Sequence, residues 1–294
     1  WGPSMAVIGG RMFLQGPGKM TAVDVYTGRI LWQLPISGDA KYLPGRRGND
    51  FEGNLAGYHF LAVEDAVYLV HEKSCLKLDP KTGEQINEFK LPNPDDDWGR
   101  IRVIGEKLIA EIFRDIDADK TKLPPSKQLL AGTKAAVEIL AIDRNTGSKL
   151  WSHEAEASFP VLAVGKDRVF AFDGALESFY KDWKRRGNIP KASDIRYAKA
   201  IDLETGKLIW KEQTEFIGTW MSYSGSSDVV LMSNKSSIMA VNGRNGKELW
   251  KQSSEAVGFR GHPESLWDRV IVWNDRLLDQ RGPGLAWNLL TGER

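Results

Sequence analysis

The sequence contains little of several features that would identify a specialised class of protein. It has one cysteine among 294 residues, which excludes an internal disulfide framework. Lys and Arg together number 40 and Asp and Glu 39, so the net charge of +1 gives no sign of binding to nucleic acid or to a membrane surface. No run of about 18 apolar residues is present, so no membrane-spanning segment is expected. These features indicate an ordinary globular domain.

Motifs of known catalytic chemistry are also missing. There is no G-x-S-x-G elbow, no P-loop and no H-E-x-x-H sequence. The four histidines are scattered without the spacing of metal ligands, at His59, His71, His153 and His262. The sequence therefore provides no catalytic, cofactor-binding or metal-ligating residue. Whether the chain is an enzyme stays open, and a non-enzymatic role is preferred.

A short frame recurs six times along the chain. In the stretch from Ala200 to Trp210, Asp202 precedes Gly206 by four residues and Trp210 follows it by four. The acidic or amide residue recurs in all six copies and the tryptophan in four, around Gly28, Gly83, Gly147, Gly206, Gly246 and Gly292. Asp or Asn can accept hydrogen bonds from turn amides, and Gly tolerates a positive φ. The frame predicts a strand, a tight turn and a second strand.

The spacing of the copies indicates the architecture. The gaps between the six turn glycines are 55, 64, 59, 40 and 46 residues. About 40 residues hold four short strands with their turns, which is the content of one propeller blade. Small and large apolar residues alternate before each turn, so both faces of that strand are expected to be covered, with the tryptophan filling the wedge between two sheets. The expected fold is an all-β propeller with six four-stranded blades visible.

The frame Asp-x-x-Thr-Gly-x-x-x-Trp resembles that of the quinoprotein-type (PQQ-like) β-propeller repeats over the whole chain. That superfamily includes calcium-dependent quinoprotein alcohol dehydrogenases and a non-enzymatic lipoprotein of outer-membrane barrel assembly. Residues 15–18 (QGPG) together with residues 260–263 (RGHP) are most similar to uncharacterised bacterial multidomain proteins, planctomycete ones among them. The resemblance alone implies a location in the periplasm or cell envelope.

The resemblance implies more than one function. The dehydrogenases hold their cofactor with a calcium ion and a disulfide between adjacent cysteines, which the lone Cys75 cannot form. We therefore prefer a binding or scaffold propeller that recognises an unidentified protein or small ligand, with no cofactor assigned. The alternatives are the propeller portion of a quinoprotein-like oxidoreductase, or of a multidomain enzyme whose catalytic module lies outside this chain.

All 294 residues are expected to form one propeller domain. Its blades are expected at residues 1–35, 58–91, 98–155, 159–213, 219–253 and 260–294. The sixth blade ends just after its turn and lacks the outer strand. We expect the chain to be a fragment of a longer protein whose remainder completes a ring of seven or eight blades.

The second blade departs from the repeat at two positions. Lys77 stands where the other blades have a small alanine, and Asn87 stands where four blades have tryptophan. Two hypotheses explain both changes: a ligand crevice between blades, or sequence drift that Phe89 compensates. In the same strand, Cys75 occupies a column of apolar residues and is expected to be a buried, inert thiol.

Three insertions are the candidates for a functional surface, because loops on a rigid scaffold carry binding sites. They cover residues 35–57, 113–136 and 174–195. The first contains the basic turn 45–50, for which a solvated loop is preferred over a phosphate site.

The second insertion begins with Asp115, Asp117 and Asp119, at positions one, three and five of a possible calcium loop. Lys120 and Ser126 replace the glycine and glutamate that such a loop requires, so a solvated acidic loop is preferred. The third insertion predicts a short amphipathic helix, with an apolar stripe of Leu176, Phe179, Tyr180 and Trp183 and a basic side of Lys181, Lys184, Arg185 and Arg186. We expect the stripe to pack on the propeller rather than to bind single-stranded nucleic acid.

Overall fold

The fold is known from a computed structural model. It describes residues 4–16, 18–36, 60–122, 131–132, 134–155, 161–174, 185, 187, 196–216, 220–233, 237–253, 270–273, 276–279 and 285–293. The chain divides into two compact units, one of residues 1–119 with 130–154 and the other of residues 120–129 with 155–294. Each is described by itself, and the expected single domain over the whole chain stays a prediction.

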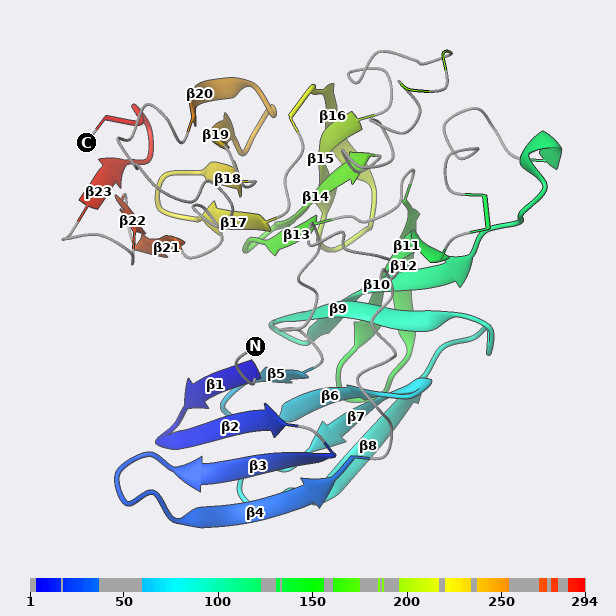
Figure 1. The fold of residues 1–294 in the computed structure, drawn as a ribbon, viewed down its shortest axis with the longest axis vertical. Helices are drawn as coiled ribbons and strands as arrows, with labels where there is room; N and C mark the ends of the chain where they lie inside the picture. The colour runs from blue at the N-terminus through cyan, green and yellow to red at the C-terminus, as the bar shows by residue number, and fades with distance from the viewer. Residues whose placement is uncertain are drawn as a thin grey trace. The chain divides into compact units, whose positions relative to one another are not determined.

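The first unit contains three four-stranded antiparallel sheets, each a meander in chain order (Figure 1). The first sheet is β1 (Ser4–Ile8), β2 (Arg11–Gly16), β3 (Lys19–Asp24) and β4 (Ile30–Pro35). The second is β5 (Phe60–Ala62), β6 (Val67–His71), β7 (Ser74–Leu78) and β8 (Gln85–Lys90). The third is β9 (Asp97–Ile104), β10 (Lys107–Asp115), β11 (Lys134–Asp143) and β12 (Lys149–Glu154).

The second unit contains two further four-stranded sheets and one with three strands among its described residues. The fourth sheet is β13 (Val161–Val164), β14 (Arg168–Gly174), β15 (Arg196–Asp202) and β16 (Leu208–Gln213). The fifth is β17 (Trp220–Ser224), β18 (Val229–Ser233), β19 (Ser237–Asn242) and β20 (Glu248–Ser253). The sixth is β21 (Val270–Trp273), β22 (Arg276–Asp279) and β23 (Leu285–Asn288). The predicted β-propeller fold is confirmed, including the shorter sixth blade.

Helices contribute little to the described residues. The 3-10 helix η3 (Lys120–Lys122) follows β10. No helix within these ranges is long and apolar enough to cross a membrane.

The aspartate or asparagine at the end of each third strand shapes the turn that follows. Asp24 Oδ1 accepts hydrogen bonds from the backbone nitrogens of Tyr26 at 3.0 Å and Thr27 at 2.8 Å. Hydrogen bonds from the Thr27 backbone and hydroxyl hold the pKa of Asp24 below its ordinary value. Gly28 has a φ of 70° and donates its N–H to Asp24 O at 2.9 Å. Both backbone bonds recur at Asp79, Asp143, Asp202 and Asn288, and Asn242 accepts the first of them from Arg244 N. The prediction that these are turn residues is confirmed.

The repeated tryptophan packs on the turn glycine of the next blade. A Cβ added at Gly83 would lie 2.6 Å from the Trp32 ring, so the indole occupies the space that a side chain would need. Trp32 Nε1 also donates to Pro80 O at 3.2 Å. Within the second unit, both contacts recur between Trp210 and Gly246 with Gly243 O, and between Trp250 and Gly292 with Leu289 O. The prediction that tryptophan fills the wedge between sheets is confirmed for these blades.

The cores of both units lie between adjacent sheets. Between the first and second sheets, Phe13, Met20 and Trp32 pack against Val67 and Leu69. Similar clusters lie between the second and third sheets, the fourth and fifth, and the fifth and sixth. Each sheet therefore buries apolar side chains on the face that meets its neighbour, as the alternation in the sequence predicts.

Blade two replaces the docking tryptophan with three side chains. Phe89 covers Gly147 of the next blade, where an added Cβ would lie 2.7 Å from the phenyl ring. Lys77 Nζ donates to Arg144 O at 3.1 Å. This carbonyl lies three residues before the turn glycine, which is the position that accepts the indole N–H in the other blades. Asn87 lies directly opposite Lys77 in the sheet and donates to Asn145 O at 2.9 Å. The compensation by Phe89 is confirmed, and Lys77 completes it.

Candidate interaction surface

The topology of each blade separates its connections into two ends. In a four-stranded meander, the first and third connections leave from one end of the sheet, which we call the turn end. The second connection, and the link to the next sheet, leave from the opposite or loop end. At the turn end the two connections hydrogen-bond to each other, as from Val25 N to Gly10 O at 3.1 Å and from Arg144 N to Glu106 O at 3.0 Å. All three predicted insertions leave from the loop end of their own sheets, since they join β4 to β5, β10 to β11 and β14 to β15.

The second insertion begins and ends as a β-ribbon. Strands β10 and β11 continue to the pair of Asp115 with Lys134, past a register shift after Ile112. Residues 113–115 and 134–136 of the predicted insertion are therefore strand, because the backbone pairing of the blade continues along β10 and β11. Beyond the ribbon, Asp117 is exposed and its carboxylate accepts a bond from Asp119 N at 2.9 Å.

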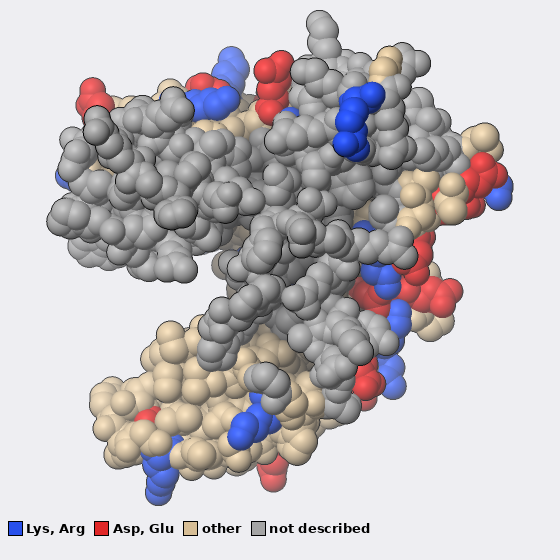
Figure 2. Space-filling view, in the orientation of Figure 1, with Lys and Arg blue, Asp and Glu red and all other residues tan. Residues whose placement is uncertain are grey.

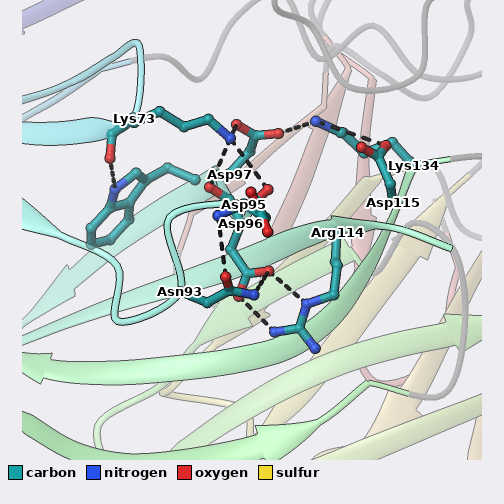
Figure 3. Close-up of polar contacts among 9 residues, drawn as sticks. Lys73, Asn93, Asp95, Asp96, Asp97, Arg114, Asp115 and Lys134 are labelled. Carbon is teal, nitrogen blue, oxygen red and sulfur yellow. Dashed lines mark hydrogen bonds and ion pairs between the residues drawn. The ribbon is translucent and has the colours of Figure 1, made fainter.

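A cluster of charged side chains lies at the base of this ribbon (Figure 3). We call it the Asp96–Asp97 cluster, and it consists of Lys73, Asn93, Asp95, Asp96, Asp97, Arg114, Asp115 and Lys134. Its members come from the turn between β6 and β7, the segment between β8 and β9, the start of β9, the end of β10 and the start of β11. Blades two and three of the first unit therefore meet here at the loop end.

Asp96 joins the segment between β8 and β9 to the ribbon. Its buried carboxylate accepts two hydrogen bonds from Arg114, from Nε to Oδ1 and from Nη2 to Oδ2, each 2.6 Å long. Asn93 Nδ2 donates to Asp96 Oδ1 at 3.0 Å. The hydrogen bond from Arg114 to Asp96 raises the pKa of the guanidinium. A bidentate, charge-assisted pair of this kind restricts both partners to one geometry.

Asp97 joins the second blade to the same ribbon. Lys73 Nζ lies 2.6 Å from Asp97 Oδ1, and Lys134 pairs with Oδ2. Burial raises the pKa of Asp97, but hydrogen bonds from Lys134 and Lys73 outweigh it and hold the pKa below its ordinary value. Trp98 Nε1 donates to Lys73 O at 3.2 Å, which fixes the backbone of the lysine turn. Four chain segments are thus held together by two carboxylates.

The ion pairs of the cluster fix the positions of neighbouring chain segments and do not suit the cluster to proton transfer. Asp96 and Asp97 are both engaged in ion pairs, so neither offers the poised carboxyl of a general acid or base. The Asp115 side chain lies 4.0 Å from Lys134 Nζ and is 81% exposed, and Asp95 is also exposed. Acidic and basic side chains gather around the loop between β8 and β9 and the adjoining strand ends (Figure 2). Within the described ranges, no group of three or more His, Cys, Asp or Glu could hold a metal ion.

Several residues named in the sequence analysis lie outside the described residues. They include the basic turn 45–50, most of the insertion 174–195, His59 and His262. Of the predicted amphipathic helix, Arg185 is described and is helical and exposed. Cys75 is buried, and burial raises the pKa of its thiol, so the prediction of a buried thiol is confirmed.

The Asp96–Asp97 cluster was not predicted from the sequence. Its signal is the run of three aspartates before Trp98, at the boundary between blades two and three. The lysine and arginine partners are between 18 and 37 residues distant in the chain, so their pairing depends on the sheet register.

The fold and the repeat define the class of protein as a PQQ-like β-propeller. A family model described as "Outer membrane protein assembly factor BamB" matches residues 135–294, more than half of the chain, and the chain belongs to that family. No curated protein matches the sequence.

Solved structures show the same fold. BamB from Moraxella catarrhalis is similar with a TM-score of 0.56 and 15% identity, over 94% of this chain and 68% of that one. Quinohemoprotein alcohol dehydrogenase from Comamonas testosteroni has a TM-score of 0.54 and 14% identity, over 90% and 45%. The Pan2 WD40 domain of Neurospora crassa has a TM-score of 0.53 and 10% identity, over 85% and 63%. The chain spans between 45% and 68% of the length of these proteins.

Proposed function

We propose that this chain is a non-enzymatic binding or scaffold propeller of the bacterial cell envelope, and that it docks a protein at the loop end of blades two and three. The supporting observation is the Asp96–Asp97 cluster, which holds the base of an extended β-ribbon in one geometry through two buried carboxylates. The envelope location is supported by the family description, which names an outer membrane protein assembly factor.

A fixed ribbon suits docking because the ribbon then loses little conformational entropy when a partner binds. Ordering a mobile loop during association would lower the affinity, and a surface that is already ordered avoids that loss. The outward carboxylates of Asp95 and Asp115 add negative charge beside the ribbon. We therefore propose a partner that presents basic side chains to this edge, because complementary charge sets register and speeds association.

Charge reversal tests this proposal. The double variant Asp95→Lys with Asp115→Lys reverses two exposed side chains. It removes the 4.0 Å contact of Asp115 with Lys134, and it leaves the bonds of Asp96 with Arg114 and of Asp97 with Lys73 in place. The matched control reverses two exposed acids at turn ends, Glu84→Lys with Glu248→Lys. Quantitative affinity purification from the native organism should recover a protein partner with wild type and control but not with the first variant. Equal recovery with all three would contradict the proposed surface.

A second function is favoured by the likeness in fold to a quinohemoprotein alcohol dehydrogenase. In that case the chain is the propeller portion of a quinone-dependent oxidoreductase, or of a multidomain bacterial enzyme whose catalytic module lies elsewhere. Calorimetric titration of the purified chain with PQQ and calcium separates the two proposals. Saturable binding of PQQ would favour the oxidoreductase, and its absence would favour the scaffold.

A further inference from the structure

A tyrosine and two cations meet a shared carboxylate at the turn end between blades four and five. Asp228 Oδ1 accepts a hydrogen bond from Tyr223 Oη at 2.9 Å and another from Arg168 Nη2 at 2.9 Å. Asp228 Oδ2 accepts a third from Arg244 Nε at 3.2 Å. One negatively charged side chain therefore satisfies donors from three different residues.

A tyrosine and two cations also meet at the turn end between blades two and three, within the first unit. Tyr68 on β6 lies directly opposite Lys77 on β7 in the register of the sheet. Arg144, from the turn after β11, holds its guanidinium over the Tyr68 ring, 5.7 Å from the ring centroid. All three residues are buried, with 0% of Tyr68, 8% of Lys77 and 7% of Arg144 exposed.

These three side chains share no carboxylate. Lys77 Nζ donates to two neutral oxygens, Arg144 O at 3.1 Å and Asn145 Oδ1 at 2.8 Å, and it pairs with no carboxylate among the residues that the structure describes. Arg144 pairs with Asp65 through Nη2. Arg144 Nε and Tyr68 Oη are both buried, and neither has a hydrogen-bond partner within the described ranges. Buried charges are normally paired and buried donors normally bonded, so this junction calls for an acceptor.

The carboxylates near this junction are bonded elsewhere. Asp65 is engaged by Arg144. Glu106 Oε2 accepts a hydrogen bond from Asn145 Nδ2 at 2.6 Å. Asp143 accepts the amide bonds of its own turn. None of these three side chains takes the position that Asp228 has between blades four and five.

The pKa values of two groups agree with a surplus of positive charge at this junction. Burial lowers the pKa of Lys77, and the charge of Arg144 lowers it further. Burial raises the pKa of Tyr68 to about 12, so its hydroxyl is protonated at neutral pH and can donate a hydrogen bond. A negatively charged acceptor would stabilise all three donors.

We propose that a small inorganic anion, of the size of chloride, binds between blades two and three at the turn end and accepts hydrogen bonds from Lys77 Nζ, Arg144 Nε and Tyr68 Oη. The anion must be small because Tyr68 belongs to the packed core between these blades. The ammonium group reaches this point because blade two has lysine and asparagine where other blades have alanine and tryptophan. The site is independent of the docking surface proposed above, which lies at the loop end.

Urea unfolding of the full chain tests the proposal, in sodium chloride and in sodium gluconate at equal ionic strength. Chloride is the probe, and gluconate is too large for a packed interface. The urea midpoint of wild type should rise saturably with chloride, because an anion that binds only the folded chain stabilises it. Lys77→Met should weaken the apparent affinity for chloride about tenfold or more, and Tyr68→Phe about threefold or more.

Tyr223→Phe is the matched control, because the Tyr223 hydroxyl already donates to Asp228. This variant should leave the chloride dependence of the midpoint unchanged. Tyr68→Phe has a further signature, since in gluconate it removes a buried hydroxyl that has no partner. Its midpoint should therefore equal or exceed that of wild type in gluconate and fall below it in chloride. A purely structural role would shift the midpoint equally in both salts and would overturn the proposal.

Bromide provides a direct measurement of the same site. In crystals of the full chain soaked in sodium bromide, we expect an anomalous peak within hydrogen-bonding distance of Lys77 Nζ and Tyr68 Oη. Density without an anomalous signal would identify a water molecule and overturn the proposal. Bromide bound without any saturable effect of chloride on the urea midpoint would show an adventitious ion only. A chloride dependence that is equal in wild type and in Lys77→Met would also overturn the proposal.

Discussion

The contact between Trp32 and Gly83 permits a direct test of how the blades are held together. Gly83→Ala and Gly28→Ala add the same methyl group to turns with nearly the same backbone, because the φ values are 77° and 70°. At Gly83 the new Cβ would lie 2.6 Å from Trp32 Cδ2 and 2.7 Å from Cε3, whereas at Gly28 it meets nothing within 4 Å. The two substitutions therefore differ in the neighbouring ring and in little else.

The magnitudes follow from these contacts. Alanine in the left-handed region costs about 1 kcal/mol of folding free energy at either site. At Gly83 the ring must also move, and it is buried and hydrogen-bonded to Pro80 O. Overpacking of this kind costs about 1–3 kcal/mol. We expect Gly83→Ala to lower the free energy of unfolding by about 2–4 kcal/mol in total, against about 1 kcal/mol for Gly28→Ala.

Urea unfolding of both variants, followed by circular dichroism, measures the difference. A double-mutant cycle adds Trp32→Ala, which removes the ring that the methyl group would meet. In that background Gly83→Ala should cost no more than the backbone conformation does, so the two substitutions should be strongly non-additive. Equal losses of stability for Gly83→Ala and Gly28→Ala, or an additive cycle, would refute the reasoning.

Three further predictions concern individual side chains. Trp250→Ala should lower stability in urea by about 3–5 kcal/mol, whereas Asn87→Ala should cost about 1 kcal/mol; similar small losses for both would contradict the docking role of tryptophan. Lys77→Met keeps the volume but leaves Arg144 O without its donor, so unfolding in urea should show a loss of about 1–3 kcal/mol, and unchanged stability would show that this bond contributes nothing. Burial raises the pKa of Glu111 from 4.5 to about 7, so the folded chain binds this proton more tightly than the unfolded chain. The contribution of Glu111 to the free energy of unfolding is fully present below pH 4.5 and is lost as the pH rises to about 7. The urea midpoint of wild type should fall over that pH range, and the midpoint of Glu111→Gln should not.

The turn and the blade could be predicted from the sequence because their causes are local. Asp24 bonds to amides two and three residues away, and Gly28 needs only its own φ. The tryptophan position is also local, since it lies opposite Ala22 in the register of one hairpin. Because each blade has the same local requirements, the turn residues and the tryptophan recur in the sequence at fixed distances from one another.

The replacement in blade two was predictable in part. Lys77 and Asn87 stand out as departures from the frame, and Phe89 is near enough in sequence to suggest compensation. The role of Lys77 was not predictable, because its acceptor is Arg144 O, 67 residues away. That contact depends on how two sheets pack.

The local chemistry of the chain determines the strands, the turns and the repeat, and with them the propeller class. Tertiary structure alone decides the Asp96–Asp97 cluster and which apolar side chains of a strand are covered. The three aspartates before Trp98 carry no local signal of burial. Lys73 from the turn between β6 and β7, Arg114 from β10 and Lys134 from β11 pair with two of them. Met5 and Phe60 are equally apolar in sequence, yet one is exposed and the other buried. Burial and ion pairing are properties of neighbours in space, and for these residues the neighbours come from distant parts of the chain.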